Sequence, residues 1–242
     1  MKAVTVLLSC LLVAACWALP RSSVNSVIEY VFCPFAPALR AQERSAIVDS
    51  ILQAMENARQ DMIESGMEPM HVDEVEYDLI DLGLPGILEG LVRAKNAIIH
   101  GITTFRVENM NLALLTTTLT FDLHIDELDA IVEFFELIDG IVDGAAVSGK
   151  ASGDVQVSNI HVNGRVRLSI GIITGISVRD VNFRLRVGGV KSNVVGEDVQ
   201  GIGNQDVNEF IETQAMTIIS KHESAITSAI NAIVMDLLDT LL

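Results

Sequence analysis

Three segments in the middle of the chain change the alternation of their apolar residues in the same way, and this feature constrains the fold most. Between residues about 98–195, Thr, Val and Ile alternate with polar residues, which is typical of β-strands with one apolar face. In three places the apolar residues switch parity across the pattern apolar, polar, Asn or Asp, apolar. These places are Val107-Glu108-Asn109-Met110, Val157-Ser158-Asn159-Ile160 and Val178-Arg179-Asp180-Val181.

A slip of one residue moves every later side chain of a strand to the other face of the sheet. Each of these strands therefore keeps one apolar face only if it contains an extra residue, a β-bulge, at the switch. Asn and Asp tolerate the backbone angles that a bulge can require. Bulges bend strands, and three at comparable positions curl a sheet in one direction, so the sequence predicts a strongly curved antiparallel sheet.

Amphipathic helices are predicted on both sides of this sheet, which makes the expected fold class α+β. In residues about 41–65, Ile51, Met55 and Met62 belong to an apolar stripe with helical spacing. A longer stripe, which includes Ile218, His222 and Ile226, predicts one helix over residues about 205–242. At about 1.5 Å per residue that helix would exceed the width of a compact domain, so it either bends or forms the axis of an elongated molecule.

Several local patterns fix the expected connections. The acidic segment 71–78 is interpreted as a solvated linker, and residues 82–86 as a turn. The apolar residues of segment 128–142 recur with the spacing of a helix. Asn163-Gly164 predicts a hairpin, for which a three-residue loop pairs the apolar rows better than a two-residue loop. That register places a row of arginines on the outer face, where a solvated surface and a site for an anionic partner both remain open: Arg165, Arg167, Arg184 and Arg186.

The N-terminus has the pattern of a secretory signal peptide. Lys2 precedes an apolar stretch that ends in small residues near Ala18, which predicts cleavage after residue 18 and an exported protein. Residues 19–242 are then expected to form a single domain. Cleavage would remove Cys10 and Cys16 and leave Cys33 as a free or intermolecular thiol.

Composition excludes some partners and leaves two kinds of interior open. The formal net charge is -16, and loss of Lys2 makes it -17, which argues against nucleic acid and against docking on anionic membranes. Half the chain is apolar, but only one Trp, two Tyr and eight Phe are present, so the interior is aliphatic. Such an interior suits flexible acyl or isoprenoid chains. An ordinary aliphatic core fits the composition equally well.

Enzyme motifs are missing, so no catalytic residue, cofactor or metal ion is expected. The sequence has no Gly-x-Ser-x-Gly, His-Glu-x-x-His, phosphate-binding loop or Cys-x-x-Cys pattern. His124 and Asp126 would share one strand face, but further ligands for a metal ion are not identified. His222 interrupts an apolar stripe, where it is either a satisfied core histidine or a polar contact for a ligand head group.

Three short motifs resemble the mite group 7 allergens and the insect juvenile-hormone-binding and takeout proteins. They are the strand entry at residues 101–110, the segment Val132-Glu133-Phe134-Phe135-Glu136-Leu137-Ile138-Asp139-Gly140, and the Gly-rich turn at residues 148–153. The resemblance covers roughly residues 40–242. It implies a tubular lipid-binding fold, in which a highly curved sheet wraps a long helix around a hydrophobic tunnel, and it makes the second half of residues 128–142 a strand. A lone Cys33 lacks the N-terminal disulfide of the hormone carriers, which favours the mite-allergen-like branch.

These observations predict a secreted carrier or sensor that holds an apolar small molecule, such as a fatty acid or isoprenoid, by burial. The residues expected to line its tunnel are Ile51, Met55, Met62, Phe105, Leu112, Ile218, His222 and Ile226. The alternative is an extracellular interaction or innate-immune recognition module for microbial lipid surfaces, with a filled core.

Overall fold

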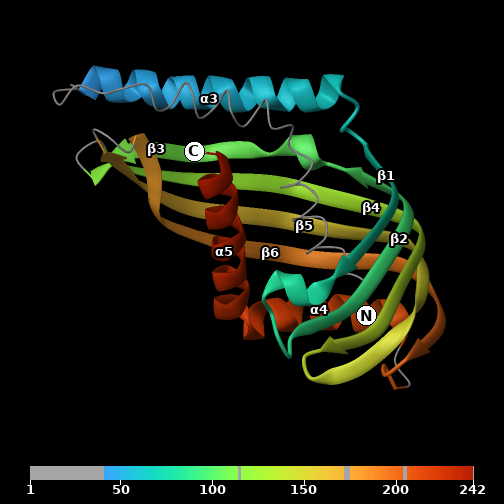
Figure 1. Ribbon diagram of the computed structural model, residues 1–242. Helices are drawn as coiled ribbons and strands as arrows, with labels where there is room; N and C mark the ends of the chain where they lie inside the picture. Colours follow the sequence, from blue (N-terminus) through green and yellow to red (C-terminus); the bar gives the residue numbers. More distant parts are fainter. Residues whose placement is uncertain (1–40, 114–115, 172–174, 204–205, 242) are drawn as a thin grey trace.

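The computed structural model describes residues 41–113, 116–171, 175–203 and 206–241, which form one six-stranded antiparallel sheet and three α-helices (Figure 1). Helix α3 (Ala41–Glu64) precedes the sheet, and α4 (Val207–Lys221) and α5 (Glu223–Leu241) follow it. Short 3-10 turns, η1 (Leu79–Leu82) and η2 (Ile102–Thr104), flank the second strand. The strands are β1 (Met70–Asp78), β2 (Leu88–His100), β3 (Arg106–Ala113), β4 (Thr118–Val142), β5 (Ala145–Gly171) and β6 (Gly175–Gln200).

The sheet is built on three strands of 25 to 27 residues, β4, β5 and β6, which pair in chain order. On the other edge of β4, β2 pairs with its second half and β3 with its first half. β1 extends the sheet beyond β2. Figure 1 shows the long strands running across the molecule and curling over at the end where α4 lies. The predicted antiparallel, strongly curved sheet is therefore confirmed.

Two of the three predicted bulges change the strand register as expected. The pairing of β3 with β4 shifts between Val107 and Asn109, which makes Glu108 the extra residue. The pairing of β5 with β6 shifts where Arg167 faces Asp180 and Leu168 faces Val178, so Arg179 is extra. Both bulges lie where the apolar parity switches, because the extra residue keeps the apolar side chains on one face.

The third switch, at Asn159, occurs without any change of register. Asn159 has a φ of 51°, in the left-handed region, and Val157 and Ile160 on its two sides are both buried. The neighbouring strands switch parity at the same level: Val157 and Ile160 pair with Leu128 and Ile125 in β4 and with Val190 and Val187 in β6. The three strands β4, β5 and β6 therefore change face at the same level without an extra residue. The bulge predicted at Asn159 is wrong, and we call this shared switch of faces across the sheet the crease.

The sheet is longer than the sequence predicts, since it begins at Met70 and ends at Gln200. The acidic segment 71–78 is strand β1, not a linker, and its pairs run from Met70 with Ile99 to Asp78 with Leu91. Its charged side chains face solvent and pair with those of β2, as Lys95 does with Glu74 at 2.7 Å. Its apolar residues pack against the core, Met70 fully and Val72, Val75 and Tyr77 partly buried, and this packing outweighs the polar composition of the segment.

The turn predicted at Asn163-Gly164 is wrong, because β5 continues straight through both residues. Val162 pairs with Leu123 and Leu185, and Gly164 faces Phe121. A Cβ atom on Gly164 would lie 2.1 Å from Cζ of the Phe121 ring, so the glycine makes room for an aromatic ring within a strand. In contrast, the turn at residues 82–86 is confirmed, since Gly83 caps η1 with a φ of 67°. Residues 128–142 are strand throughout, as the family resemblance implies for their second half.

The predicted terminal helix is broken in two at His222. This residue has φ −113° and ψ 24°, outside the helical region, yet its N–H still donates to the Ile218 carbonyl at 2.9 Å. Its own carbonyl accepts from Ile226 N–H at 3.0 Å, so helical hydrogen bonding continues into α5. Because of the non-helical angles at His222, α5 runs in a different direction from α4 (Figure 1). Of the two expected outcomes for so long a helix, the bend is the one observed.

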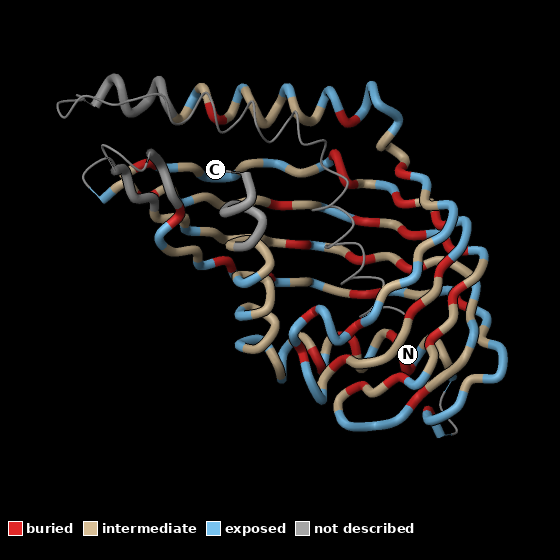
Figure 2. The backbone as a smooth tube through the Cα atoms, in the orientation of Figure 1, coloured by how far each residue is buried: buried red, intermediate tan, exposed pale blue. Residues whose placement is uncertain are grey.

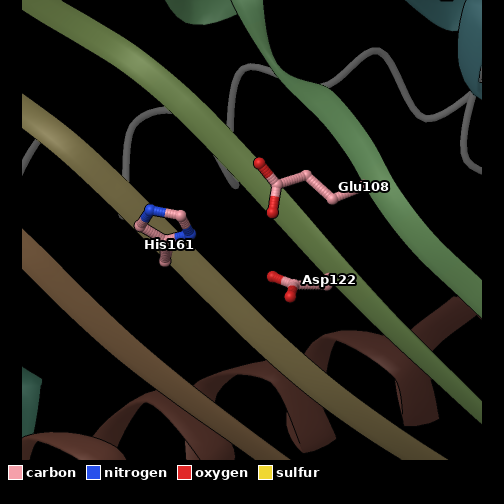
Figure 3. Close-up of side chains that lie close together, drawn as sticks. All are labelled: Glu108, Asp122 and His161. Atoms are coloured by element: carbon pink, nitrogen blue, oxygen red, sulfur yellow. The ribbon is translucent and has the colours of Figure 1, made fainter.

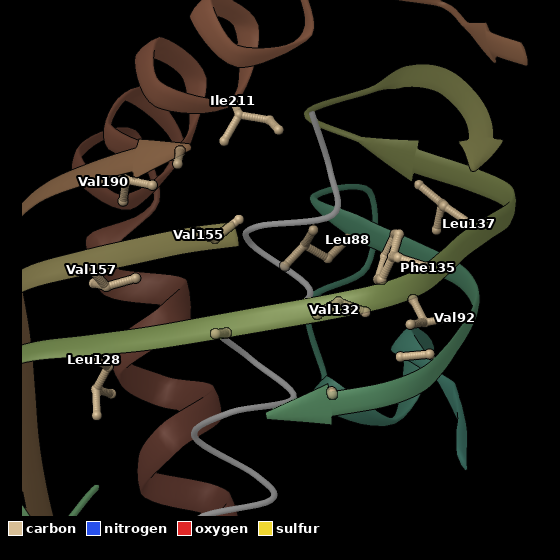
Figure 4. Packing of buried hydrophobic residues seen from close by; sticks show 14 of the residues in the cluster. Leu88, Val92, Leu128, Val132, Phe135, Leu137, Val155, Val157, Val190 and Ile211 are labelled. Carbon is tan, nitrogen blue, oxygen red and sulfur yellow. The ribbon is translucent and has the colours of Figure 1, made fainter. Parts of the chain in front are cut away.

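The centre of the core lies where α4 packs against the curled end of the sheet. Ile211 of α4 is almost completely buried, as are Leu88, Val92 and Val157 of the strands (Figure 4), and Ile218 of α4 is equally buried. The buried segments gather at this end of the molecule (Figure 2). Burying a side chain of this size stabilises the fold by about 1.5–3 kcal/mol. None of the described helices is long and apolar enough to cross a lipid bilayer. The predicted signal peptide and Cys33 lie outside the described residues.

Candidate functional site

The apolar interior is tightly filled at the end occupied by α4. A pocket here is lined by Phe135, Leu137, Val147, Val207 and Ile211 among others, and its volume is about 20 Å³. That is room for roughly one water molecule. Ile211 has no exposed surface at all. This end of the molecule behaves as an ordinary core and leaves no space in that pocket for a ligand.

The end occupied by α5 is covered much more loosely. Ile226, Ala229 and Ile230 of α5 pack against the core but remain partly exposed. Among the side chains of α5 that the structure describes, residues 223–235, none is fully buried. Tan segments mark this loose covering along α5 in Figure 2. A hydrogen bond from Phe183 N–H to Asn231 Oδ1 at 2.6 Å joins the helix to β6.

The inner face of the sheet is also incompletely covered at this end. Leu123 and Ile125 of β4, Val162 of β5 and Val187 of β6 are half-buried, although they lie in the middle of a sheet. Beyond the crease, the corresponding residues Leu128 and Val157 are buried. In the same two rows Ile160 and Leu185 are buried, so the apolar lining changes from fully covered to partly covered along these strands.

The eight predicted lining residues do not converge on one place. Met62 and Ile218 belong to the main apolar cluster, and Ile226 packs against it. Ile51 and Leu112 are buried outside that cluster, on α3 and β3, which contact each other. Met55 and Phe105 are half-buried and also lie outside it. Contact of any of these residues with a ligand stays a prediction.

His222 binds to the protein itself. Its Nε2 lies 2.9 Å from Asp143 Oδ1, and Lys221 Nζ lies 2.8 Å from both oxygens of the same carboxylate. Hydrogen bonds from Lys221 and then from His222 hold the pKa of the Asp143 carboxyl below its ordinary value. The tip of the β4–β5 hairpin is thereby clasped to the break between α4 and α5. Asp143 was not predicted, because only the three-dimensional fold brings residues 143 and 222 together.

The other face of the sheet carries a polar cluster that the sequence did not predict. Ligand-type atoms of Glu108, Asp122 and His161 all lie within 4.8 Å of one another (Figure 3). The three residues belong to β3, β4 and β5 and alternate with the inward apolar residues. Their separation of up to 53 positions gives no signal in the sequence without the strand register. His124 and Asp126, which share this face of β4, both contact Arg106, at 3.0 Å and 2.6 Å.

Comparison with known proteins gives matches of two kinds. Among solved structures, Takeout 1 of Epiphyas postvittana is similar at 14% identity with a TM-score of 0.43, covering 71% of this chain and 79% of that one. Lipopolysaccharide binding protein is similar at 9% identity with a TM-score of 0.31, covering 81% of this chain but 38% of that one. No curated protein matches.

The family comparison extends over nearly the whole chain. The profile that matches is described as haemolymph juvenile hormone binding protein, and it covers residues 13–242. The match includes all three motifs that carry the resemblance noted in the sequence, and that resemblance is confirmed. Placement in the mite-allergen-like branch stays a prediction. The chain belongs to the haemolymph juvenile hormone binding protein family.

Proposed function

We propose that this protein is a secreted carrier that holds an apolar, lipid-like small molecule between α5 and the curved sheet. The observation that carries the proposal is the incompletely buried apolar surface of both elements, formed by Ile226 and Ile230 on the helix and by Leu123, Val162 and Val187 on the strands. Apolar side chains in the middle of a sheet are normally sealed, because each exposed Å² costs about 25 cal/mol. A ligand chain would complete the covering.

The proposed ligand is held by burial and needs few polar contacts. About ten buried methylenes contribute roughly 8 kcal/mol, at about 0.8 kcal/mol each, which equals the free energy of micromolar binding. The cost of association has to be subtracted from this sum, so a chain somewhat longer than ten carbons is required. Membership of a family described as hormone binding supports a ligand of this class. A single-chain fatty acid or an isoprenoid fits it.

We further propose that the curved sheet and the helices together form a tube around this ligand. The sheet already curls over α4 at one end, where residues of β4 and β5 line a small pocket together with Ile211. At the other end α5 crosses the strands and contacts β6. In this arrangement the filled α4 end closes the tube, and the ligand enters beside α5.

The test is displacement of a fluorescent fatty-acid probe from the delipidated protein, residues 19–242. Ile226→Asn puts a polar group on the proposed lining, and we expect it to weaken probe binding at least tenfold. Ile131→Asn is the matched control, since Ile131 lies on the opposite face of β4 and is 44% exposed. Equal affinity of the two variants, or no binding by the unchanged protein, would contradict the proposal.

The alternative is an interaction module for microbial lipid surfaces, and the filled pocket beside Ile211 is the observation in its favour. Such a module would bind vesicles containing lipopolysaccharide but would not take up a soluble fatty-acid probe. Sedimentation with those vesicles, carried out beside the probe assay, separates the two functions.

A further inference from the structure

The outer face of the sheet brings together three metal-binding side chains from three strands. Glu108 is the extra residue of the β3 bulge, and its neighbour Asn109 pairs with Asp122 of β4. His161 of β5 pairs with His124, which lies two residues beyond Asp122 on the same face of β4. The register of the strands and the bulge therefore place all three side chains in one patch, as Figure 3 shows. We propose that Glu108, Asp122 and His161 form a binding site for a divalent transition-metal ion, with Zn²⁺ as the best fit.

The donor set favours Zn²⁺ over Ca²⁺ or Mg²⁺. One imidazole nitrogen and two carboxylates are ordinary zinc ligands, and three protein ligands leave the fourth tetrahedral position for water. Calcium and magnesium prefer oxygen ligands alone. In a tetrahedral zinc site the ligand atoms are about 3.3 Å apart, given bonds of about 2.0–2.1 Å. The present atoms lie within 4.8 Å of one another, so small side-chain rotations close the site.

An unsatisfied oxygen at the centre of the patch is independent support for a bound cation. Asp122 Oδ1 is buried and has no hydrogen-bond partner among the described residues. A buried carboxylate oxygen without a donor is costly, and a few such atoms in a native structure usually have a specific explanation. A metal ion held by Asp122 would satisfy this oxygen.

A second layer of side chains holds the proposed ligands in place. The His124 ring stacks on the His161 ring, with centroids 4.2 Å apart and planes 11° apart. His124 is itself 9% exposed, and its Nδ1 lies 3.4 Å from Glu108 Oε1. Arg106 contacts His124 and forms an ion pair with Asp126 at 2.6 Å. Ordered neighbours of this kind fix the orientation of metal ligands.

Positive charges also border the patch, and they limit the expected affinity. On β6, Arg186 pairs with His161 of β5, and Arg184 pairs with Asn163 of β5. Both arginines are exposed, so solvent screens their repulsion of a cation. Their long side chains are free to extend into solvent, whereas the carboxylates of Glu108 and Asp122 are proposed as direct ligands of the ion.

The test is titration of the untagged protein with Zn²⁺ in competition with a chromogenic chelator. We expect one Zn²⁺ per chain and at least a tenfold loss of affinity in both His161→Ala and Asp122→Asn. His71→Ala is the matched control, because His71 is an exposed histidine on β1, and it should bind as the unchanged protein does. Ca²⁺ should not displace Zn²⁺.

Two further measurements keep the outcome decisive. Circular dichroism shows whether each variant is folded, and Glu108→Gln tests the site from an exposed side chain if a variant at residue 122 or 161 does not fold. Co²⁺ in place of Zn²⁺ should give the intense visible absorption of a tetrahedral site, and His161→Ala should lose it. Absence of Zn²⁺ binding, or binding that all three variants retain, would overturn the proposal. Neither result bears on lipid binding, which uses the other face of the sheet.

Discussion

Replacement of two isoleucines on opposite sides of the helix break at His222 should distinguish the fully covered end of the interior from the partly covered end. Ile218 of α4 is 1% exposed, whereas Ile226 of α5 is only partly buried where it packs against the core. Ile218→Ala removes buried methyl groups and leaves a cavity, for which the usual cost is about 2–5 kcal/mol. Alanine is the better helix former by a few tenths of a kcal/mol, so we expect a net loss of about 3 kcal/mol in the free energy of unfolding.

Ile226→Ala should cost much less in the ligand-free protein, about 1 kcal/mol, because part of its side chain is already exposed to water. Ile226→Ala should instead weaken the binding of an apolar ligand. The folded molecules of Ile218→Ala should bind that ligand with nearly the affinity of the unchanged protein. Urea unfolding of delipidated protein measures the first effect: with a slope of about 2–3 kcal/mol per M, Ile218→Ala should lower the midpoint by about 1 M. Equal destabilisation by the two variants would refute the division of the interior into a fully covered and a partly covered end.

Three further predictions follow from individual contacts. Asp143→Asn should lower stability by about 1 kcal/mol at pH 5, since it weakens a partly exposed clasp with Lys221 and His222. Because the pKa of Asp143 is lowered in the folded state, this contribution is fully present above the ordinary value of about 3.9 and is lost as the pH falls through the folded value, so melting curves of the two proteins should converge towards pH 2. Gly164→Ala should displace the Phe121 ring and cost about 1–3 kcal/mol, whereas Gly189→Ala, whose nearest contact is Ser158 Oγ at 3.3 Å, should be tolerated; thermal melts and near-UV circular dichroism distinguish them. Asn159→Val should cost about 1–2 kcal/mol because of its positive φ, and Asn159→Gly should melt close to the unchanged protein.

The parity of apolar residues was the most informative signal in the sequence, because it depends on which face of a strand is buried. It located the bulges at Glu108 and Arg179. It located the switch at Asn159 but not its nature, since a bulge and a crease give the same pattern within one strand. Only the parallel switches at Ile125 and Val187 in the neighbouring strands separate the two.

Local turn and linker signals failed where tertiary packing decided the structure. Asn163-Gly164 is a strong hairpin signal in a peptide, but here the glycine accommodates Phe121 and the strand continues. The acidic residues of 71–78 suggested a linker, although their apolar neighbours pair with β2. The clasp at Asp143 and the cluster around Asp122 join residues that are distant in the chain, so no local pattern announces them.

The central claim is that the space beside α5 holds an apolar molecule. Native mass spectrometry of the protein secreted from insect cells tests it most directly, because a bound lipid appears as added mass. We expect one apolar molecule per chain, which is removed by organic solvent and restored by incubation with a long-chain fatty acid. Detection of the protein only at the mass of its polypeptide chain, together with no uptake of any fatty acid or isoprenoid of a panel after extraction, would contradict the account.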